Sequence, residues 1–184
     1  KKIDGLLIDY RDAIQYLHDQ TLRYMNKGFT PDEIKEVVTM PDRLRDHPWL
    51  GEYYGSYKHA IPAIFAGYLG WYQGDPVALN PTPWIEKAKR YVDLMGGRDK
   101  VLSLANEALN DDDAQWGAEL LTWLVRADRS DQEARNMKAE ALRRWSYRQK
   151  NATWRNWGLT SAMELDGELD AAGGGMVLGS PDQV

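Results

Sequence analysis

Cysteine is absent from the 184-residue sequence, which excludes disulfides, thiol nucleophiles and cysteine-ligated zinc. The three histidines, His18, His47 and His59, are never three or four residues apart, so the spacings typical of histidine metal sites are missing. No glycine-rich phosphate-binding motif is present either. From its residues we therefore expect this chain to hold no metal and no cofactor by itself.

Long apolar runs and a basic surface are also missing. No apolar run reaches the about 20 residues that a membrane-spanning helix needs. The formal net charge is −5, with Lys and Arg dispersed among acidic residues. Proteins that bind nucleic acid carry a basic face. We therefore predict no membrane span and no nucleic-acid partner.

Phenylalanine is scarce, at two residues, whereas there are eight Trp and ten Tyr. Aromatic rings with a polar group are common where one end is buried and the other meets water or a partner. The aromatic composition therefore favours a protein with an interface, without identifying the partner.

Apolar residues near the N-terminus recur at alternating steps of four and three, the pattern of a packed amphipathic helix. The members of this stripe are Ile3, Leu7, Tyr10, Ile14, Leu17, Thr21 and Tyr24. We predict a helix from about Asp4 to Asn26, ended by Gly28 and about 35 Å long. Such a length exceeds what a small core needs, so we expect this helix to pack against another domain or subunit.

Capping and breaking residues divide the rest of the chain into further helices, and no segment shows sustained strand alternation. Thr30 and Glu33 form a capping box, which starts a short helix. Further helices are predicted over 56–71, 83–95, 98–110, 112–127, 130–150 and 153–165. The predicted fold is all-α, with one helical domain over residues 1–166 and a flexible tail or linker over 167–184. EALN at 107–110 recurs as EALR at 140–143, which favours tetratricopeptide-like helix pairs.

Two polar clusters have simple structural explanations. His18 and Asp19 are neighbours on the long helix and point about 100° apart, so they do not converge on one ligand. We predict a polar flank that hydrogen-bonds across to a packed element. Asp111, Asp112 and Asp113 lack the ligand spacing of a calcium-binding loop, so we predict that they cap a helix.

The segment EYYGSYKHA is the better candidate for a site, because it places tyrosines and a histidine around a glycine in a predicted loop. Tyr53, Tyr54, Tyr57 and His59 can donate hydrogen bonds to an anion or transfer a proton. The alternative is an aromatic plug that closes the helical core. The residues alone leave both interpretations open.

Several stretches, taken together and in order, resemble the helical dimerisation domain of alkyl sulfatases, which are metal-dependent hydrolases of the metallo-β-lactamase superfamily. The resemblance covers most of the chain, from about residue 10 to 165. The stretches that carry it are YRDAIQYLHDQTLRYMNKGFTPDEI, EYYGSYKHAIPAIFAGYLGWYQGDPVALNP, AKRYVDLMGG and WRNWGLTSAMEL. This chain departs from the family at His59-Ala60, where other members more often carry His-Asn.

The resemblance implies a parent enzyme that hydrolyses alkyl sulfate esters with water activated by two zinc ions. It implies a catalytic domain with a His-x-His-x-Asp-His motif before this domain and a lipid-binding, sterol-carrier-like domain after it. Neither neighbour is present in this sequence, so no catalytic residue is assigned here. A periplasmic or secreted location follows from the resemblance only.

Three hypotheses for the function follow. The first is homodimer assembly, for which the candidate contacts are Leu7, Ile14, Leu17, His18, Asp19, Gln20, Leu22 and Met25. The second is that Tyr53, Tyr54, Tyr57 and His59 line the substrate pocket of the catalytic domain. The alternative to both is a tetratricopeptide-like module that binds a peptide or another protein in a helical groove.

Overall fold

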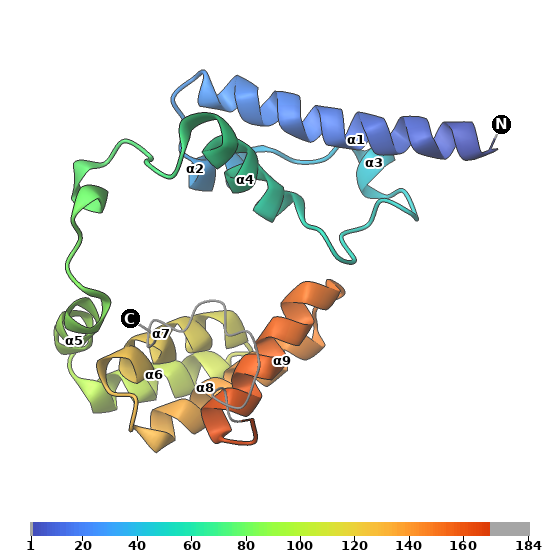
Figure 1. The fold of residues 1–184 in the computed structure, drawn as a ribbon. Coiled ribbons are helices and arrows are strands. Elements are labelled where there is room, and N and C mark those ends of the chain that lie inside the picture. The colour runs from blue at the N-terminus through green and yellow to red at the C-terminus, as the bar shows by residue number, and fades with distance from the viewer. Residues whose placement is uncertain (1, 170–184) are drawn as a thin grey trace. The chain divides into compact units, whose positions relative to one another are not determined.

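The computed structural model describes residues 2–169, and all regular structure in that range is helical (Figure 1). The all-α prediction is therefore confirmed. The elements are α1 Lys2–Met25, α2 Pro31–Val37, α3 Asp42–Arg45, α4 Tyr57–Leu69, the 3₁₀ turn η1 Pro76–Leu79, α5 Trp84–Leu94, α6 Arg98–Asn110, α7 Ala114–Ala127, α8 Gln132–Tyr147 and α9 Ala152–Asp166.

The chain divides into two compact units, which are described separately. The first unit ends at Pro81 and the second begins at Thr82. Helix α9 is followed by Gly167 in a left-handed conformation, one residue after the predicted domain boundary. Most of the predicted tail, residues 170–184, lies outside the described residues, so the domain organisation stays a prediction.

Local sequence signals account for the helix ends. At the start of α2, the Thr30 hydroxyl accepts a bond from the Glu33 N–H, and the Glu33 carboxylate accepts one from the Thr30 N–H. Before α7, the Asp113 carboxylate accepts a bond from the Trp116 N–H at 3.0 Å. The capping interpretation is thus confirmed for the predicted box and for the last aspartate of the acidic triplet.

The core of the first unit forms where α2 and α4 pack against the C-terminal half of α1. Its buried residues are Ile34, Val38, Ile61 and Phe65. Leu17, Tyr24 and Met25 of α1 pack against this cluster. Nearer its N-terminus, α1 is attached to α3 by charge, because Arg43 pairs with both Asp9 and Asp12.

In the second unit, α5, α6 and α8 pack against α7, and α9 packs against α8. Leu121 of α7 and Val101 of α6 are fully buried in its core. Each helix contacts a neighbour in sequence, as in many helical domains. The tetratricopeptide-like detail of the prediction is not confirmed by this arrangement.

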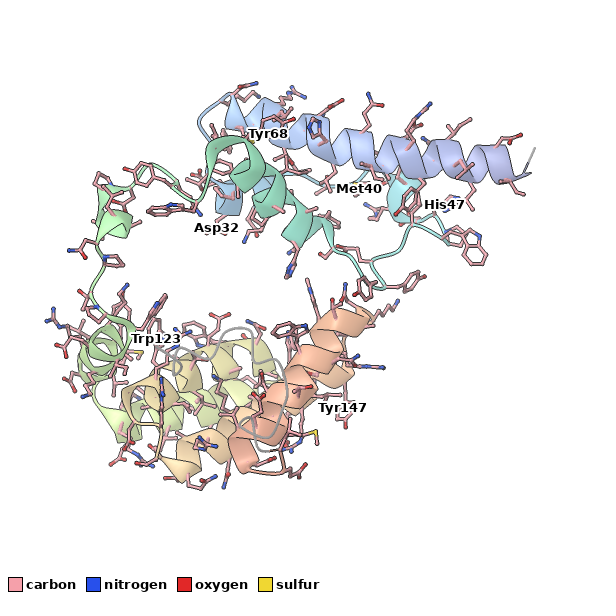
Figure 2. All side chains as sticks on the ribbon, in the orientation of Figure 1. Asp32, Met40, His47, Tyr68, Trp123 and Tyr147 are labelled. Atoms are coloured by element: carbon pink, nitrogen blue, oxygen red, sulfur yellow. The ribbon has the colours of Figure 1, made fainter. Side chains whose placement is uncertain are left out.

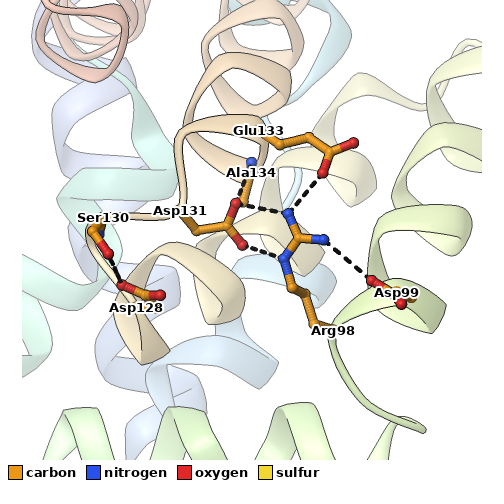
Figure 3. A network of polar contacts seen from close by, with 7 residues as sticks. All are labelled: Arg98, Asp99, Asp128, Ser130, Asp131, Glu133 and Ala134. Carbon is orange, nitrogen blue, oxygen red and sulfur yellow. Dashed lines mark hydrogen bonds and ion pairs between the residues drawn. The ribbon is translucent and has the colours of Figure 1, made fainter.

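A charged network joins the start of α6 to the start of α8 (Figure 3). The Arg98 guanidinium donates to both oxygens of Asp131, at 2.6 and 2.9 Å, and to Glu133 at 2.7 Å. Asp131 also caps α8 by accepting a bond from the Ala134 N–H. The bonds from Arg98 hold the pKa of Asp131 below its usual value. The Asp131 carboxylate therefore caps the start of α8 and at the same time binds the first residue of α6.

Arg135 of α8 holds the C-terminal end of α9 in place through hydrogen bonds, and we predict the effect of replacing it. Its guanidinium donates to the backbone carbonyls of Leu165 at 2.9 Å and Glu164 at 3.0 Å. Arg135→Met removes these charge-assisted bonds and leaves the carbonyls without a donor, so we expect the free energy of unfolding to fall by about 2 kcal/mol. Urea denaturation followed by circular dichroism measures the change.

The matched control for Arg135→Met is Arg155→Met, which removes an exposed arginine from α9 itself. Surface substitutions of this kind usually change stability by less than about 0.5 kcal/mol. Equal effects of the two substitutions would show that the contacts of Arg135 with the end of α9 contribute nothing.

Candidate functional site

The apolar stripe of α1 is covered at one end of the helix and uncovered at the other. Toward the C-terminus, Leu17 and Tyr24 pack into the core and Thr21 is fully buried. Toward the N-terminus, Leu7 is 62% exposed and Ile14 is 57% exposed. Large apolar side chains that continue a core stripe into solvent are typical of a surface that packs against another protein. We call the uncovered part the α1 stripe, which consists of Ile3, Leu7, Tyr10 and Ile14.

His18 lies beside the stripe and joins α1 to α4. Its Nε2 atom lies 2.9 Å from the hydroxyl oxygen of Tyr68, which Figure 2 shows on α4. The expectation that this polar flank bonds to a packed element is therefore confirmed. Its Nδ1 atom lies 3.0 Å from Asp19 Oδ1. Because a carboxylate only accepts hydrogen bonds, Nδ1–H donates to Asp19, and in the neutral imidazole Nε2 then accepts from the Tyr68 hydroxyl.

The contact between His18 and Asp19 was not foreseen from the sequence, which predicts only that the two residues do not converge on one ligand. The backbone does separate them, but the Asp19 side chain turns back toward the imidazole ring. The result is a chain of three polar groups with an exposed carboxylate at its end. Its evident role is to hold α4 against α1.

The other predicted contacts of α1 are distributed between the core and the surface. Leu17 and Met25 pack against the core of the first unit, and Leu22 is half-buried. Gln20 is half-buried and accepts a long bond, 3.5 Å, from Arg23. The interface role assigned to these residues stays a prediction. The exposed members of the set are Leu7, Ile14 and Asp19, of which Leu7 and Ile14 are apolar.

The tyrosine segment is separated by burial into two parts. Tyr57 begins α4 and packs against the core, as the aromatic-plug interpretation expects. Tyr53 and Tyr54 precede the helix and are exposed, Tyr54 to 77%. His59 is exposed on the first turn of α4. The structure therefore places Tyr53, Tyr54 and His59 on the surface, and it places Tyr57 partly buried against the core.

Sequence reasoning missed several exposed aromatic and apolar residues of the first unit. Trp49 follows α3, and Trp71 lies just after α4; both are largely exposed. Ile8 lies beside the α1 stripe and is exposed to 47%. The excess of Trp and Tyr over Phe was the available signal, but composition cannot show which rings remain outside the core.

The described residues offer neither a metal site nor a membrane-spanning helix. Between residues 2 and 169, no cluster of three or more His, Asp or Glu side chains could hold a metal ion. In the same range no helix combines the length and the apolar character needed to cross a membrane.

In the second unit, Lys138 of α8 is mostly removed from water, and a second prediction concerns its charge. Burial, together with the nearby charge of Arg126, lowers the pKa of Lys138 from 10.5 to about 8. In the unfolded chain the pKa returns to 10.5, so between pH 8 and 10.5 the unfolded state binds more protons. The contribution of Lys138 to the free energy of unfolding therefore rises with pH across this window and is least favourable below pH 8.

We expect Lys138→Met to raise the free energy of unfolding at pH 7 by about 1 to 3 kcal/mol, since it removes a desolvated charge and keeps an unbranched apolar side chain. The rise of stability between pH 8 and 10.5 should also become smaller. Urea denaturation at pH 7, 8.5 and 10 measures both effects. Lys100→Met, at an exposed position, serves as the control. A Lys138 variant with unchanged stability and an unchanged pH profile would contradict the assignment.

Taken together, the features above define a helical domain that leaves several large apolar and aromatic residues uncovered. The sequence profile described as alkyl sulfatase dimerisation matches residues 30–168, and the chain belongs to this family. The match begins at residue 30, after α1.

Curated relatives and solved structures agree with this assignment. A linear primary-alkylsulfatase from a Pseudomonas species is 53% identical over 171 residues, which are 92% of this chain and 32% of that protein. An alkyl/aryl-sulfatase from Saccharomyces cerevisiae is 40% identical over 89% of this chain and 25% of its own length. The structure of a stereoselective inverting sec-alkylsulfatase from a Pseudomonas species superposes with a TM-score of 0.87 at 38% identity, covering 92% of this chain and 27% of that one. The chain thus spans about a third or less of these relatives.

Proposed function

We propose that this domain joins two copies of a longer alkyl sulfatase, with the α1 stripe as part of the contact. The observation that carries the proposal is that the α1 stripe continues the row of α1 residues that packs against the core of the first unit. A symmetric contact between two identical helices requires a self-complementary apolar surface. Leu7 and Ile14 lie about two helical turns apart on the same face of α1, so they provide such a surface.

Light scattering on this chain, from low to high micromolar concentration, tests the assembly proposal directly. We expect the measured mass to rise with concentration from that of one chain to that of two. A strictly monomeric chain at high micromolar concentration would overturn autonomous dimerisation.

The parent enzyme's activity is a further part of the proposal. We propose that the parent hydrolyses alkyl sulfate esters, as the names of its relatives suggest. Two zinc ions would supply metal-activated water in a catalytic domain that is not part of this sequence. A lipid-binding-like domain is proposed as a second neighbour. The described residues offer no ligand set for zinc, so no catalytic step is derived from this chain.

The exposed tyrosines are proposed to contribute to the parent's pocket. Tyr53, Tyr54 and His59 are exposed hydrogen-bond donors, and Glu52 and Ser56 fix the turn before α4 by accepting bonds from the backbone. We propose that this segment covers the catalytic pocket of its own chain or of the partner chain. It would then donate hydrogen bonds to the sulfate oxygens or to the leaving alcohol.

Turnover of the full-length enzyme tests this role of the tyrosine segment. We expect Tyr53→Phe, Tyr54→Phe or His59→Ala to lower the rate of alkyl sulfate hydrolysis. Tyr147→Phe, at an exposed tyrosine of the second unit, is the matched control. Wild-type rates for all three substitutions would overturn the pocket role and leave the assembly proposal untouched.

A further inference from the structure

His47 lies in the turn that follows α3, and each of its ring nitrogens faces a group of the first unit (Figure 2). Its Nδ1 atom accepts a hydrogen bond from the Trp49 backbone N–H at 3.2 Å. Its Nε2 atom lies 3.7 Å from Asp9 Oδ2 of α1, and the side chain is only 20% exposed. The ring is therefore held between its own turn and the long helix.

The bond from Trp49 fixes where the neutral imidazole carries its hydrogen. Because Nδ1 accepts from an N–H group, it has no hydrogen of its own, so the hydrogen is on Nε2, on the side of Asp9. A second proton can only be added at Nδ1, which changes that atom from an acceptor into a donor. Two N–H groups would then face each other, and the bond from Trp49 would be lost. Histidine is the side chain that ordinarily gains this proton between about pH 5 and 8.

The charges around the ring favour its movement towards α1 once it is protonated. Asp9 and Asp12 of α1 share one permanent cation, Arg43 of α3, which pairs with both. Arg43 repels a protonated ring, but the two carboxylates outnumber it, so a second cation completes the balance of charge. The charges next to the ring in sequence, Arg45 and Asp46, pair with each other. Among the residues that the structure describes, no other hydrogen bond or ion pair reaches the ring.

The bond from Trp49 is the first of several short-range bonds that shape the segment before α4. The Leu50 N–H donates to the His47 carbonyl at 3.1 Å, and the Tyr53 N–H donates to the Gly51 carbonyl at 2.8 Å. The Trp49 side chain is 75% exposed, so packing contributes little to its position. Its position therefore depends on these backbone bonds, and on the imidazole that accepts the first of them.

We propose that His47 is a pH-sensitive switch: the neutral ring holds the backbone of Trp49, and the protonated ring releases Trp49 and binds Asp9. Lowering the pH thus transfers the ring from its own turn to α1, which changes the position of the exposed Trp49 side chain. It also strengthens the attachment of α3, a helix of four residues of which only Leu44 is buried. The switch belongs to the first unit and does not depend on dimerisation or on the role of the tyrosine segment.

The switch is tested by NMR on the chain itself between pH 8.5 and 5.5, with circular dichroism confirming that the fold is retained. Long-range nitrogen–hydrogen spectra of the imidazole ring show which nitrogen is protonated. At pH 8.5 we expect Nδ1 of His47 to be unprotonated and the Trp49 amide hydrogen to be shifted downfield by its bond. On acidification the Trp49 amide signal should move upfield and the Asp9 carboxyl carbon signal should shift. Both changes should have the midpoint at which the His47 ring itself titrates.

His47→Asn is the matched variant, because an asparagine oxygen accepts a bond from the N–H two residues further on and does not titrate. In this variant we expect the Trp49 amide signal to stay downfield across the whole pH range. His59→Asn, at an exposed histidine of α4, should leave the titration of Trp49 unchanged.

Three results would overturn the proposal. They are a protonated Nδ1 of His47 at pH 8.5, a Trp49 amide that does not follow the titration of the ring, and an equal titration of that amide in the His47→Asn variant. An Asp9 carboxyl signal that stays constant while the ring titrates would overturn the transfer to α1.

Discussion

Gly158→Ala is expected to lower the free energy of unfolding of the second unit by about 2 to 3 kcal/mol. Gly158 lies in α9 where that helix crosses α8, and it is buried. A Cβ atom at this position would come closer to the Ser146 hydroxyl oxygen than real atoms approach, so either the helix or the serine must move. In an open position the same change would instead stabilise the helix by about 1 kcal/mol. Urea denaturation followed by circular dichroism measures the sign and the size of the effect.

Ser146 provides the second half of this experiment. Its hydroxyl is buried and, within the described structure, has no hydrogen-bond partner, so Ser146→Ala alone should be neutral or slightly stabilising. In the double variant the next contacts of the new Cβ are Ser146 Cβ at 3.3 Å and Trp145 Cε3 at 3.4 Å, which are tight but tolerable. We expect Ser146→Ala to recover at least half of the loss caused by Gly158→Ala.

The control is Gly5→Ala in α1, where an added Cβ meets nothing within 4 Å. That substitution should stabilise the chain. Additive effects of the changes at positions 146 and 158 would contradict the proposed clash, because residues in contact are expected to show coupling.

The second large effect concerns association of the chain. Leu7→Asp combined with Ile14→Asp should weaken self-association by at least about a hundredfold, since each apolar side chain contributes about 1.5 to 3 kcal/mol when it is fully buried. Both side chains are mostly exposed in the single chain, so its own stability should hardly change. Sedimentation equilibrium measures the association, and urea denaturation at low concentration measures the stability of the monomer.

Gln15→Asp introduces the same charge at an exposed position about a quarter turn from Ile14, and it should weaken association far less. If the double variant dimerises as tightly as the unmodified chain, the contact between copies lies elsewhere. If it unfolds, the two side chains support the first unit itself, which their exposure argues against.

Much of the fold could be predicted from local signals. The period of the α1 stripe, the capping box at Thr30 and the proline and glycine breaks depend on neighbouring residues only, and the helices appear within a few residues of their predicted ends. The assignment of stripe residues to core or surface could not be predicted. Leu7 and Leu17 occupy equivalent positions in the pattern, and only the packing of α2 and α4 distinguishes them.

The site was harder to predict because its contacts span long stretches of sequence. The partner of His18 is Tyr68, which lies fifty residues further along the chain. A projection of α1 alone cannot identify a partner on another helix. The same projection also left out the contact between His18 and Asp19, because it describes Cβ directions and not the rotation of the side chains. Asp9 and His47 come together only because α3 is attached to α1. The roles given to Tyr53, Tyr54 and His59 stay predictions until the full-length enzyme is measured.

The row of apolar residues along the whole of α1 links the stability of the first unit to the concentration of the protein. One end of helix α1 packs against the core of the first unit, and the other end is the proposed contact between copies. Folding of the first unit and association of two chains are therefore linked equilibria. A partner that binds only the folded state raises apparent stability in proportion to the logarithm of its concentration. The melting temperature of the first unit would therefore rise as the protein is concentrated, and dilution alone would lower the apparent stability of the core around Leu17 and Tyr24 without changing the folded monomer.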